Sequence, residues 1–363
     1  MRHTTVVLAL LSFAGACILQ AQSLVRIQAQ GSPRLKPATT GGEEIAPASS
    51  IRGPMMGYTP DPSGSAVWPI LGMPGAASYG GQLRSRLPFV NVTVSPSQDY
   101  ALALDARSHR VVTGDLTDPA LPFTPLPGAI RNSGRIVLSP QGSSAALLAH
   151  TGKMIQVVSG LPRNPAVSAT LDLTGLPGTL GELAISDDGS TALAVLSDGA
   201  AAFLYRLGAS GHRLIATAGR ISALAFSQSG ADAIFADAQA NAIWLIHDVR
   251  GPAELIPLAS EKDGISDPVG VALPSQGGYA AVANRKTGTI SSVPLTGGLV
   301  KPILCQCEPT TLQPLGRDIY RLNDFSAGPL WVIQARASGI NTAFVPAAQP
   351  AQSTETVTQG EVQ

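Results

Sequence analysis

The chain has few charged and few aromatic residues, and its charges of the two signs balance. Charged residues make up 13% and aromatic residues 5% of the 363, with 24 Lys and Arg against 24 Asp and Glu. Binding to nucleic acid needs an excess of basic side chains to replace the counterions of the phosphates, and the chain has no such excess. We therefore expect no nucleic-acid partner.

Long hydrophobic runs are missing beyond the N-terminus. The apolar run at residues 5–19 is shorter than the about 20 residues that a membrane-spanning helix needs. It follows Arg2 and His3 and ends in Leu19-Gln20-Ala21, as an export signal cleaved before Gln22 would. We expect residues 1–21 to be a signal peptide and the mature protein to lie in the periplasm or outside the cell, without a transmembrane segment. Lipid attachment at Cys17 is the alternative.

Motifs of well-known enzymes and metal sites are also missing. The sequence contains no Gly-rich phosphate loop, no H-E-x-x-H, no G-x-S-x-G and no pair of histidines at metal-ligand spacing. We expect no catalytic residues, no metal site and no cofactor to be identifiable from the motifs.

Glycine and proline, in contrast, are abundant, with 38 and 29 residues, and they punctuate a recurring phrase. The phrase is an apolar alternating run, a Ser/Pro-Gly turn, and a second apolar run. Its turn positions are Gln98, Gly142, Gly189, Gly230, Gly277 and Gly316, which are separated by 44, 47, 41, 47 and 39 residues. Repeats of about this length with several short strands indicate a β-propeller of four-stranded blades.

The register within the phrase supports strands. Apolar side chains stand four and six residues before the turn in nearly every copy, and residues two apart share a face of a strand. Alanine stands three residues after the turn in five copies, where we expect little room for side chains. The residues at this position are Ala101, Ala145, Ala192, Ala233, Ala280 and, in the last copy, Ile319.

The three tryptophans occupy similar apolar segments. Trp68 lies in AVWPI, Trp244 in AIWLI and Trp331 in PLWVI. We predict that all three belong to the third strand of a blade and pack between blades. Ligand stacking is the alternative for these side chains.

The two ends of the chain decide the number of blades. Residues 22–50 are polar and without periodicity, so we expect a disordered leader before a propeller domain at 51–346. Segments 55–59, 66–71 and 77–83 resemble the second, third and fourth strands of a blade that lacks its first. If the tail, residues 347–363, supplies that strand, the propeller has seven blades; if it does not, the propeller has six.

The turns resemble those of known families. Ser95-Pro96-Ser97-Gln98, Ser139-Pro140-Gln141-Gly142 and Ser186-Asp187-Asp188-Gly189, each followed by an apolar strand, are similar to the repeats of secreted bacterial YVTN-type propellers and to the WD40-like repeats of the TolB class. This resemblance implies the propeller fold. It implies little about function, because the shared residues form turns.

A binding surface is expected where the loops between second and third strands meet. Seven residues after each turn, and next to that position, stand polar side chains that the propeller would gather on one face around its channel. They form a candidate, acid-leaning rim: Asp105, His150, Asp198, Asp237, Asn284, Arg285, Asn323 and Asp324. Ordinary polar strand ends are the alternative explanation.

Cys305 and Cys307 are the two cysteines that remain after removal of the signal peptide. An oxidising compartment favours a disulfide between them. Free or partner-linked thiols are one alternative, and a redox or metal function is another.

The resulting expectation for function is an exported, monomeric binding module that recognises an unknown protein or envelope ligand through one loop face. One alternative is a lactonase-like or quinoprotein-like enzyme, in which oxygens of Asp105, Asp237, Asn284 and Asn323 would surround one ion. Another is a structural component of the cell envelope.

Overall fold

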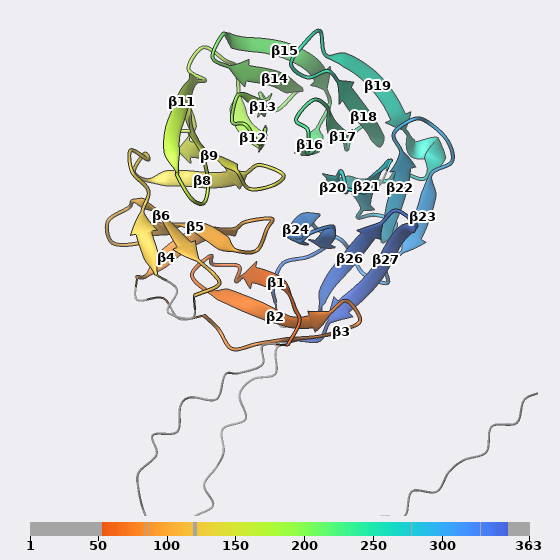
Figure 1. The fold of residues 1–363 in the computed structure, drawn as a ribbon. Coiled ribbons are helices and arrows are strands. Elements are labelled where there is room, and N and C mark those ends of the chain that lie inside the picture. The colour runs from red at the N-terminus through yellow and green to blue at the C-terminus, as the bar shows by residue number, and fades with distance from the viewer. Residues whose placement is uncertain are drawn as a thin grey trace, which may run out of the picture. The chain divides into compact units, whose positions relative to one another are not determined.

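The chain folds into a ring of seven antiparallel sheets. The computed structural model describes residues 53–83, 85, 87–118, 122–276, 278–326 and 328–347. Within these residues the sheets follow one another around a central axis (Figure 1). Six sheets have four strands and the first has three. The predicted seven-bladed β-propeller is confirmed, and the six-blade alternative is wrong.

The strands are assigned to the blades in chain order. Blade 1 contains β1 (Met55–Pro60), β2 (Val67–Met73) and β3 (Ala76–Tyr79). Blade 2 contains β4 (Phe89–Val94), β5 (Tyr100–Asp105), β6 (Val111–Asp115) and β7 (Phe123–Pro125). Blade 3 contains β8 (Ser133–Leu138), β9 (Ser144–Ala149), β10 (Met154–Ser159) and β11 (Ala166–Asp172). Blade 4 contains β12 (Thr179–Ile185), β13 (Thr191–Ser197), β14 (Ala202–Gly208) and β15 (Gly211–Ala218). Blade 5 contains β16 (Ile221–Phe226), β17 (Ala233–Asp237), β18 (Ala242–His247) and β19 (Glu254–Ala259). Blade 6 contains β20 (Pro268–Ala272), β21 (Tyr279–Asn284), β22 (Thr289–Pro294) and β23 (Lys301–Leu304). Blade 7 contains β24 (Gln313–Gly316), β25 (Ile319–Arg321), β26 (Leu330–Arg336) and β27 (Gly339–Val345).

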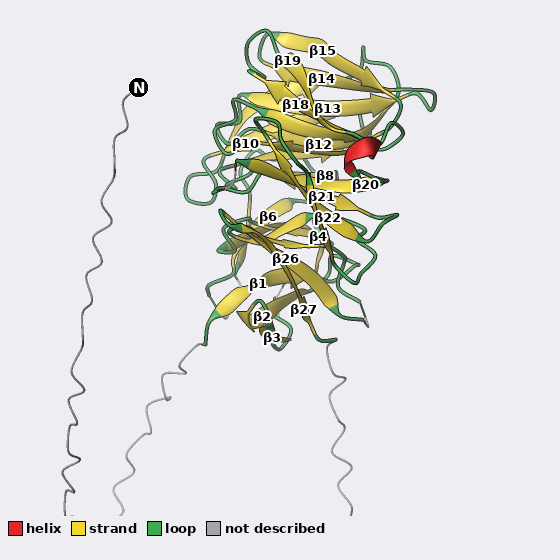
Figure 2. Ribbon diagram, turned by 90° about the vertical axis from the view of Figure 1, so that its right-hand side faces the viewer, coloured by secondary structure: helices red, strands yellow, loops and turns green. Residues whose placement is uncertain are grey.

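Helix is almost absent from the described residues. A single turn of 3-10 helix, η1 (Glu261–Asp263), precedes β20 and is the red element in Figure 2. No helix in this part of the chain is long and apolar enough to span a membrane.

The recurring Ser/Gly turn joins the first strand of a blade to its second. In blade 3 the N–H of Gly142 donates to the carbonyl of Ser139 (3.0 Å), and Gly142 has φ +78°. The N–H of Ser144 donates to Ser139 Oγ (3.1 Å). Glycine takes the left-handed conformation without a steric cost, and the serine hydroxyl accepts a backbone bond that would otherwise be unmade. These requirements of the turn explain why the motif recurs from blade to blade.

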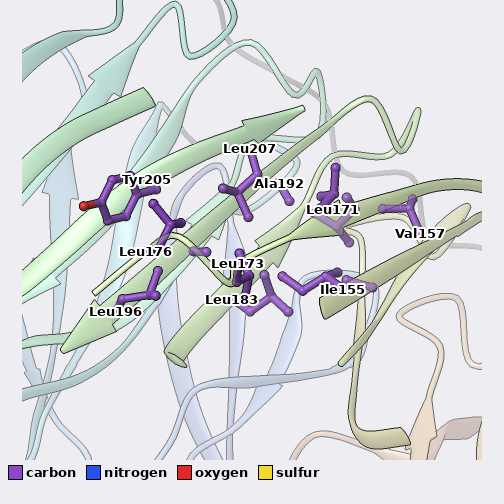
Figure 3. Packing of buried hydrophobic residues seen from close by; sticks show 13 residues of the cluster. Ile155, Val157, Leu171, Leu173, Leu176, Leu183, Ala192, Leu196, Tyr205 and Leu207 are labelled. Atoms are coloured by element: carbon purple, nitrogen blue, oxygen red, sulfur yellow. The ribbon is translucent and has the colours of Figure 1, made fainter. Parts of the chain in front are cut away.

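Apolar side chains fill the space between every pair of neighbouring blades. Figure 3 shows the cluster between blades 3 and 4, where Ile155 and Val157 of β10 face Leu183 of β12 and Ala192 and Leu196 of β13. Each of the other six junctions has a cluster of the same kind. The five alanines three residues after the turn are fully buried, as predicted. Burial of apolar area between blades therefore holds the ring together.

The strand positions predicted for blade 1 are wrong by one. β1 lies beside β24 and β4, the innermost strands of blades 7 and 2, so it is the first strand and not the second (Figure 1). The strand missing from blade 1 is the outer, fourth one. The second and third strands of a blade are both apolar and buried, so the sequence pattern alone did not distinguish them.

The same shift affects the tryptophans. Trp68 lies on β2, a second strand, whereas Trp244 and Trp331 lie on the third strands β18 and β26 as predicted. Trp244 and Trp331 pack against the clusters between blades 4 and 5 and between blades 6 and 7, and all three side chains are half-buried.

Ring closure uses side-chain packing between blades 7 and 1. Met56 and Ile70 of blade 1 pack against Leu315, Leu330 and other apolar side chains of blade 7. Gly57 permits close approach, because a Cβ at this position would lie 2.0 Å from the carbonyl oxygen of Leu315. The predicted signal peptide, the leader and residues 348–363 of the tail lie outside the described residues.

Candidate functional site: the entry face and the central channel

Antiparallel pairing places the two ends of each strand on opposite faces of the ring. The Ser/Gly turns lie on one face, which we call the turn face. On the other, which we call the entry face, each innermost strand begins and the loops between second and third strands lie. The predicted rim residues all lie on the entry face, at the ends of second strands or just after them: Asp105, His150, Asp198, Asp237, Asn284, Arg285, Asn323 and Asp324.

Two of the rim aspartates are withdrawn from solvent. Asp105 and Asp237 are only 8% and 7% exposed. Asp105 accepts hydrogen bonds from the N–H of Arg107 (3.0 Å) and from Ser108 Oγ. Asp237 accepts them from the N–H groups of Gln239 (3.0 Å) and Arg220 (3.3 Å). These carboxylates close their own loops, and the rim has less accessible acid than the sequence suggested.

The two rim asparagines have similar local roles. Asn284 is fully buried; its Oδ1 accepts from the N–H of Ser266 (3.1 Å) and its Nδ2 donates to Ser291 Oγ (2.9 Å). Asn323 accepts from the N–H of Trp331 (2.7 Å) and donates to the carbonyl of Pro329 (3.0 Å). The four oxygen-bearing side chains considered for an ion therefore lie on four blades, and each is hydrogen-bonded to groups of its own blade or of the loop that leads into it. Among the described residues no group of three or more His, Cys, Asp or Glu is placed to hold a metal.

The remaining predicted rim residues are more accessible. Asp198 accepts hydrogen bonds from the N–H groups of Ala200 and Ala201 (both 2.9 Å). His150 is exposed after β9. Asp324 is an exposed partner of Arg321.

Arg285 belongs to a cluster that the sequence analysis did not identify. Asp267, at the entry to blade 6, forms ion pairs with Arg220 of blade 5 (2.9 Å) and Arg285 of its own blade (2.6 Å). The arginine side chains are 55% and 43% exposed, and the aspartate side chain is 23% exposed. Lys286 is exposed next to Arg285. We call Arg220, Asp267, Arg285 and Lys286 the basic cluster; it carries three positive charges and one negative charge.

Hydrogen bonds lower the pKa of Asp105 and of Asp267. The Ser108 hydroxyl and then the Arg107 N–H hold the pKa of Asp105 below its ordinary value. Burial acts to raise the pKa of Asp267, but the hydrogen bonds and charges of Arg285 and Arg220 outweigh burial and lower it. Both side chains are therefore anionic at neutral pH.

A central channel opens inside the ring. It contains a cavity of about 410 Å³, lined by residues from the innermost strands of all seven blades. Most of the lining residues are of apolar type, but polar atoms make up more of the cavity surface than apolar atoms do; the charged residues in the lining are Arg135, Glu182 and Arg321.

Arg135 and Glu182 pair across the junction of blades 3 and 4. Their side chains lie 3.4 Å apart, and Arg135 Nη1 also donates to the carbonyl of Gly181. Both residues stand seven positions before the turn in their repeats, so they are equivalent residues of adjacent blades. The Arg220–Asp267 pair likewise spans 47 residues, one repeat. Opposite charges one repeat apart were the signal in the sequence that could have revealed both pairs.

Arg321 brings a third charge to the channel from blade 7. Its side chain is 15% exposed and forms an ion pair with Asp324. Sequence reasoning identified Asp324 as a rim residue and missed its partner.

The cysteines lie away from the channel, in the loop between β23 and β24. Cys305 and Cys307 are joined by a disulfide, and Cys305 is buried in the cluster between blades 6 and 7. The N–H of Cys305 donates to the carbonyl of Gly288 (3.1 Å), which ties this loop to blade 6.

Comparison with known proteins supports the fold and no closer relationship. No family model matches the chain, and no curated protein matches it. Among solved structures, a functionally unknown protein from Desulfotomaculum acetoxidans DSM 771 is 12% identical, with a TM-score of 0.50, over 78% of this chain and 96% of that one. The β-propeller domain of Cps50 (Swd1) from Myceliophteria thermophila is 14% identical, with a TM-score of 0.46, over 80% of this chain and 96% of that one. At such identities the first likeness shows the propeller fold alone.

Proposed function

We propose that this protein is an exported interaction module that binds a protein partner on its entry face. Propellers commonly act in this way, because loops from several blades form one surface on a rigid ring. Export is supported by the signal-like residues 1–21. The predicted kinship with YVTN-type and TolB-type propellers is part of this proposal.

The observation that carries the proposal is the basic cluster. Two exposed guanidinium groups share one carboxylate, and Lys286 adds a further positive charge beside them. Guanidinium groups form bidentate pairs with carboxylates, and exposed positive charge steers an oppositely charged partner towards the surface. The partner that fits is a protein with an acidic loop or terminus.

The enzyme alternative has less support from the geometry. It needed Asp105, Asp237, Asn284 and Asn323 to present oxygens to one ion, and each of these side chains is engaged in local hydrogen bonds. The interaction module is therefore the function that the site supports best.

A matched pair of variants tests the proposal. R220A/R285A removes two cations from the entry face, while R250A removes the exposed cation of the Arg250–Asp188 pair (2.8 Å) on the turn face. Immobilised mature protein is incubated with envelope extract, and each captured protein is identified, purified and titrated against the wild type and the variants. We expect a partner whose affinity falls at least about 10-fold with R220A/R285A and with rising salt, and which R250A does not affect. Equal affinity for all three proteins would overturn the proposal.

A further inference from the structure

Blade 1 has an open edge where the other blades have a fourth strand. β3 pairs with β2 on one side, with Ile70 opposite Tyr79 and Met73 opposite Ala76. Its other side has no strand partner among the described residues, whereas the third strand of each remaining blade pairs with a fourth. An unpaired edge presents a row of N–H and C=O groups that can accept another strand.

An apolar groove lies next to this edge. Its volume is about 570 Å³, and it runs between blade 1, the outer strand of blade 7 and the disulfide loop of blade 6. The lining residues are Gly75, Ala76, Ala77, Leu304, Cys305, Gln306, Trp331, Thr342, Ala343, Phe344 and Pro346. Leu304 and Phe344 are 65% and 49% exposed there, which is unusual for large apolar side chains.

Exposed apolar side chains also occur on the other face of blade 1. Leu71 and Met73, two residues apart on β2, are 44% and 58% exposed. Met55, opposite Leu71, is 43% exposed. Leu304 and Phe344 thus line the groove beside the open edge, while Met55, Leu71 and Met73 lie on the two inner strands of the same blade.

We propose that the chain's own tail occupies this place, with residues 354–358 pairing with β3 as the fourth strand of blade 1. Pro346 itself lines the groove, so the described chain leaves the ring at this site. The segment Thr354-Glu355-Thr356-Val357-Thr358 has four β-branched residues in five, a composition that favours strands.

The intervening chain is long enough for this connection. Residues 348–353 separate the last described residue from Thr354 and can span about 20–25 Å when extended. β3 has four residues and is only about 13 Å long. The tail can therefore reach either end of β3 before it pairs. Added in this way, it would complete the outer layer of blade 1 and protect the edge from other strands.

Two proline variants of the mature chain test the proposal. V357P removes an N–H and fixes φ inside the proposed strand, while V362P makes the same change outside it. Amide hydrogen exchange is followed at residues 76–79 and 354–358, together with the Tm. We expect exchange in both segments of the wild type to be at least about 10-fold slower than in an unstructured chain. V357P should abolish the protection of residues 354–358 and of those β3 amides that do not donate to β2, and it should lower the Tm by about 2–4 °C; V362P should change neither.

Three outcomes would overturn the proposal. One is exchange at residues 354–358 as fast as in an unstructured chain. Another is an equal effect of the two prolines. The third is a free edge of β3 that stays protected after deletion of residues 348–363. Sedimentation would then show what covers the edge: a dimer would indicate a second copy of the chain, and a monomer would indicate another occupant.

Discussion

Trp68 of β2 and Phe325 of the loop after β25 stack across the junction that closes the ring, with ring centroids 5.3 Å apart and planes inclined by 15°. Tyr79 of β3 meets the same phenylalanine edge-on at 5.0 Å. Chain ends form this junction, because blade 1 begins the described chain and blade 7 ends it. Aromatic contacts here reinforce the small apolar cluster between the two blades.

We expect the Trp68–Phe325 pair to contribute to closure beyond its buried area. In a double-mutant cycle of W68A, F325A and both, unfolding should give a coupling energy of about 0.5–1.5 kcal/mol. Urea denaturation followed by fluorescence measures it. Additive effects would show that the rings are adjacent without stabilising each other.

W244A and W331A should destabilise the fold without selective loss of binding. Both side chains pack against apolar clusters between blades and are half-buried. The cost should therefore lie below the about 3–5 kcal/mol of a fully buried tryptophan. Thermal unfolding together with partner titration checks this; unchanged stability with lost binding would identify a ligand-stacking role.

Tyr79 and Tyr58 make a matched pair of hydroxyl deletions. Tyr79 Oη is buried with no hydrogen-bond partner among the described residues, and burial raises the pKa of this phenol to about 12. Tyr58 Oη donates to the carbonyl of Leu116 (2.9 Å). Y79F should leave the free energy of unfolding unchanged or raise it, whereas Y58F should lower it by about 0.5–1.5 kcal/mol. Urea denaturation measures both values. A larger loss of stability in Y79F than in Y58F would contradict the assignment of a hydrogen-bond partner to Tyr58 and of none to Tyr79 among the described residues.

Acid should destabilise the propeller through its loop aspartates. The pKa of Asp105 is lower in the folded chain than its ordinary value of 3.8, so folding favours the carboxylate. This contribution is fully present above the unfolded pKa and is lost as the pH falls through the folded pKa. We expect little change in Tm from pH 7 to pH 5 and a decline below about pH 4. D105N lacks the charge, so the difference in Tm between wild type and D105N should shrink from pH 7 to pH 3. A difference that stays constant would show that Asp105 does not contribute to the acid sensitivity.

The Cys305–Cys307 disulfide should form after export and have a local effect. A ring of so few residues constrains little of the unfolded chain, so C305S/C307S should cost less than the about 2–4 kcal/mol typical of longer loops. Mass spectrometry of the non-reduced, alkylated mature protein measures oxidation, and thermal unfolding measures stability. Two alkylated thiols, or a dimer that reduction dissociates, would favour free or partner-linked cysteines.

The repeat, its strands and its turns follow from local residue chemistry. Ser139 and Gly142 have the same local partners in blade 3 as Ser186 and Gly189 have in blade 4, because a turn is made by residues that are close in the chain. Ala145 and Ala192 are buried at equivalent positions because the inter-blade spacing repeats with the sequence. Local chemistry and periodicity were sufficient to predict a propeller, while the choice between six and seven blades needed the arrangement of β1, β2 and β3 in a sheet of their own.

The identity of the strand that blade 1 lacks, and the pairing of charged residues, depend on contacts between segments that are far apart in the sequence. Second and third strands have the same apolar pattern, so Trp68 could be assigned only after β1 was seen beside β24. Asp105 and Asp237 were predicted to be accessible acids of the rim. Both side chains are instead buried and accept hydrogen bonds from nearby backbone N–H groups. Arg220 and Asp267 lie a full repeat apart in the chain and 2.9 Å apart in space, because ring geometry brings equivalent positions of adjacent blades together.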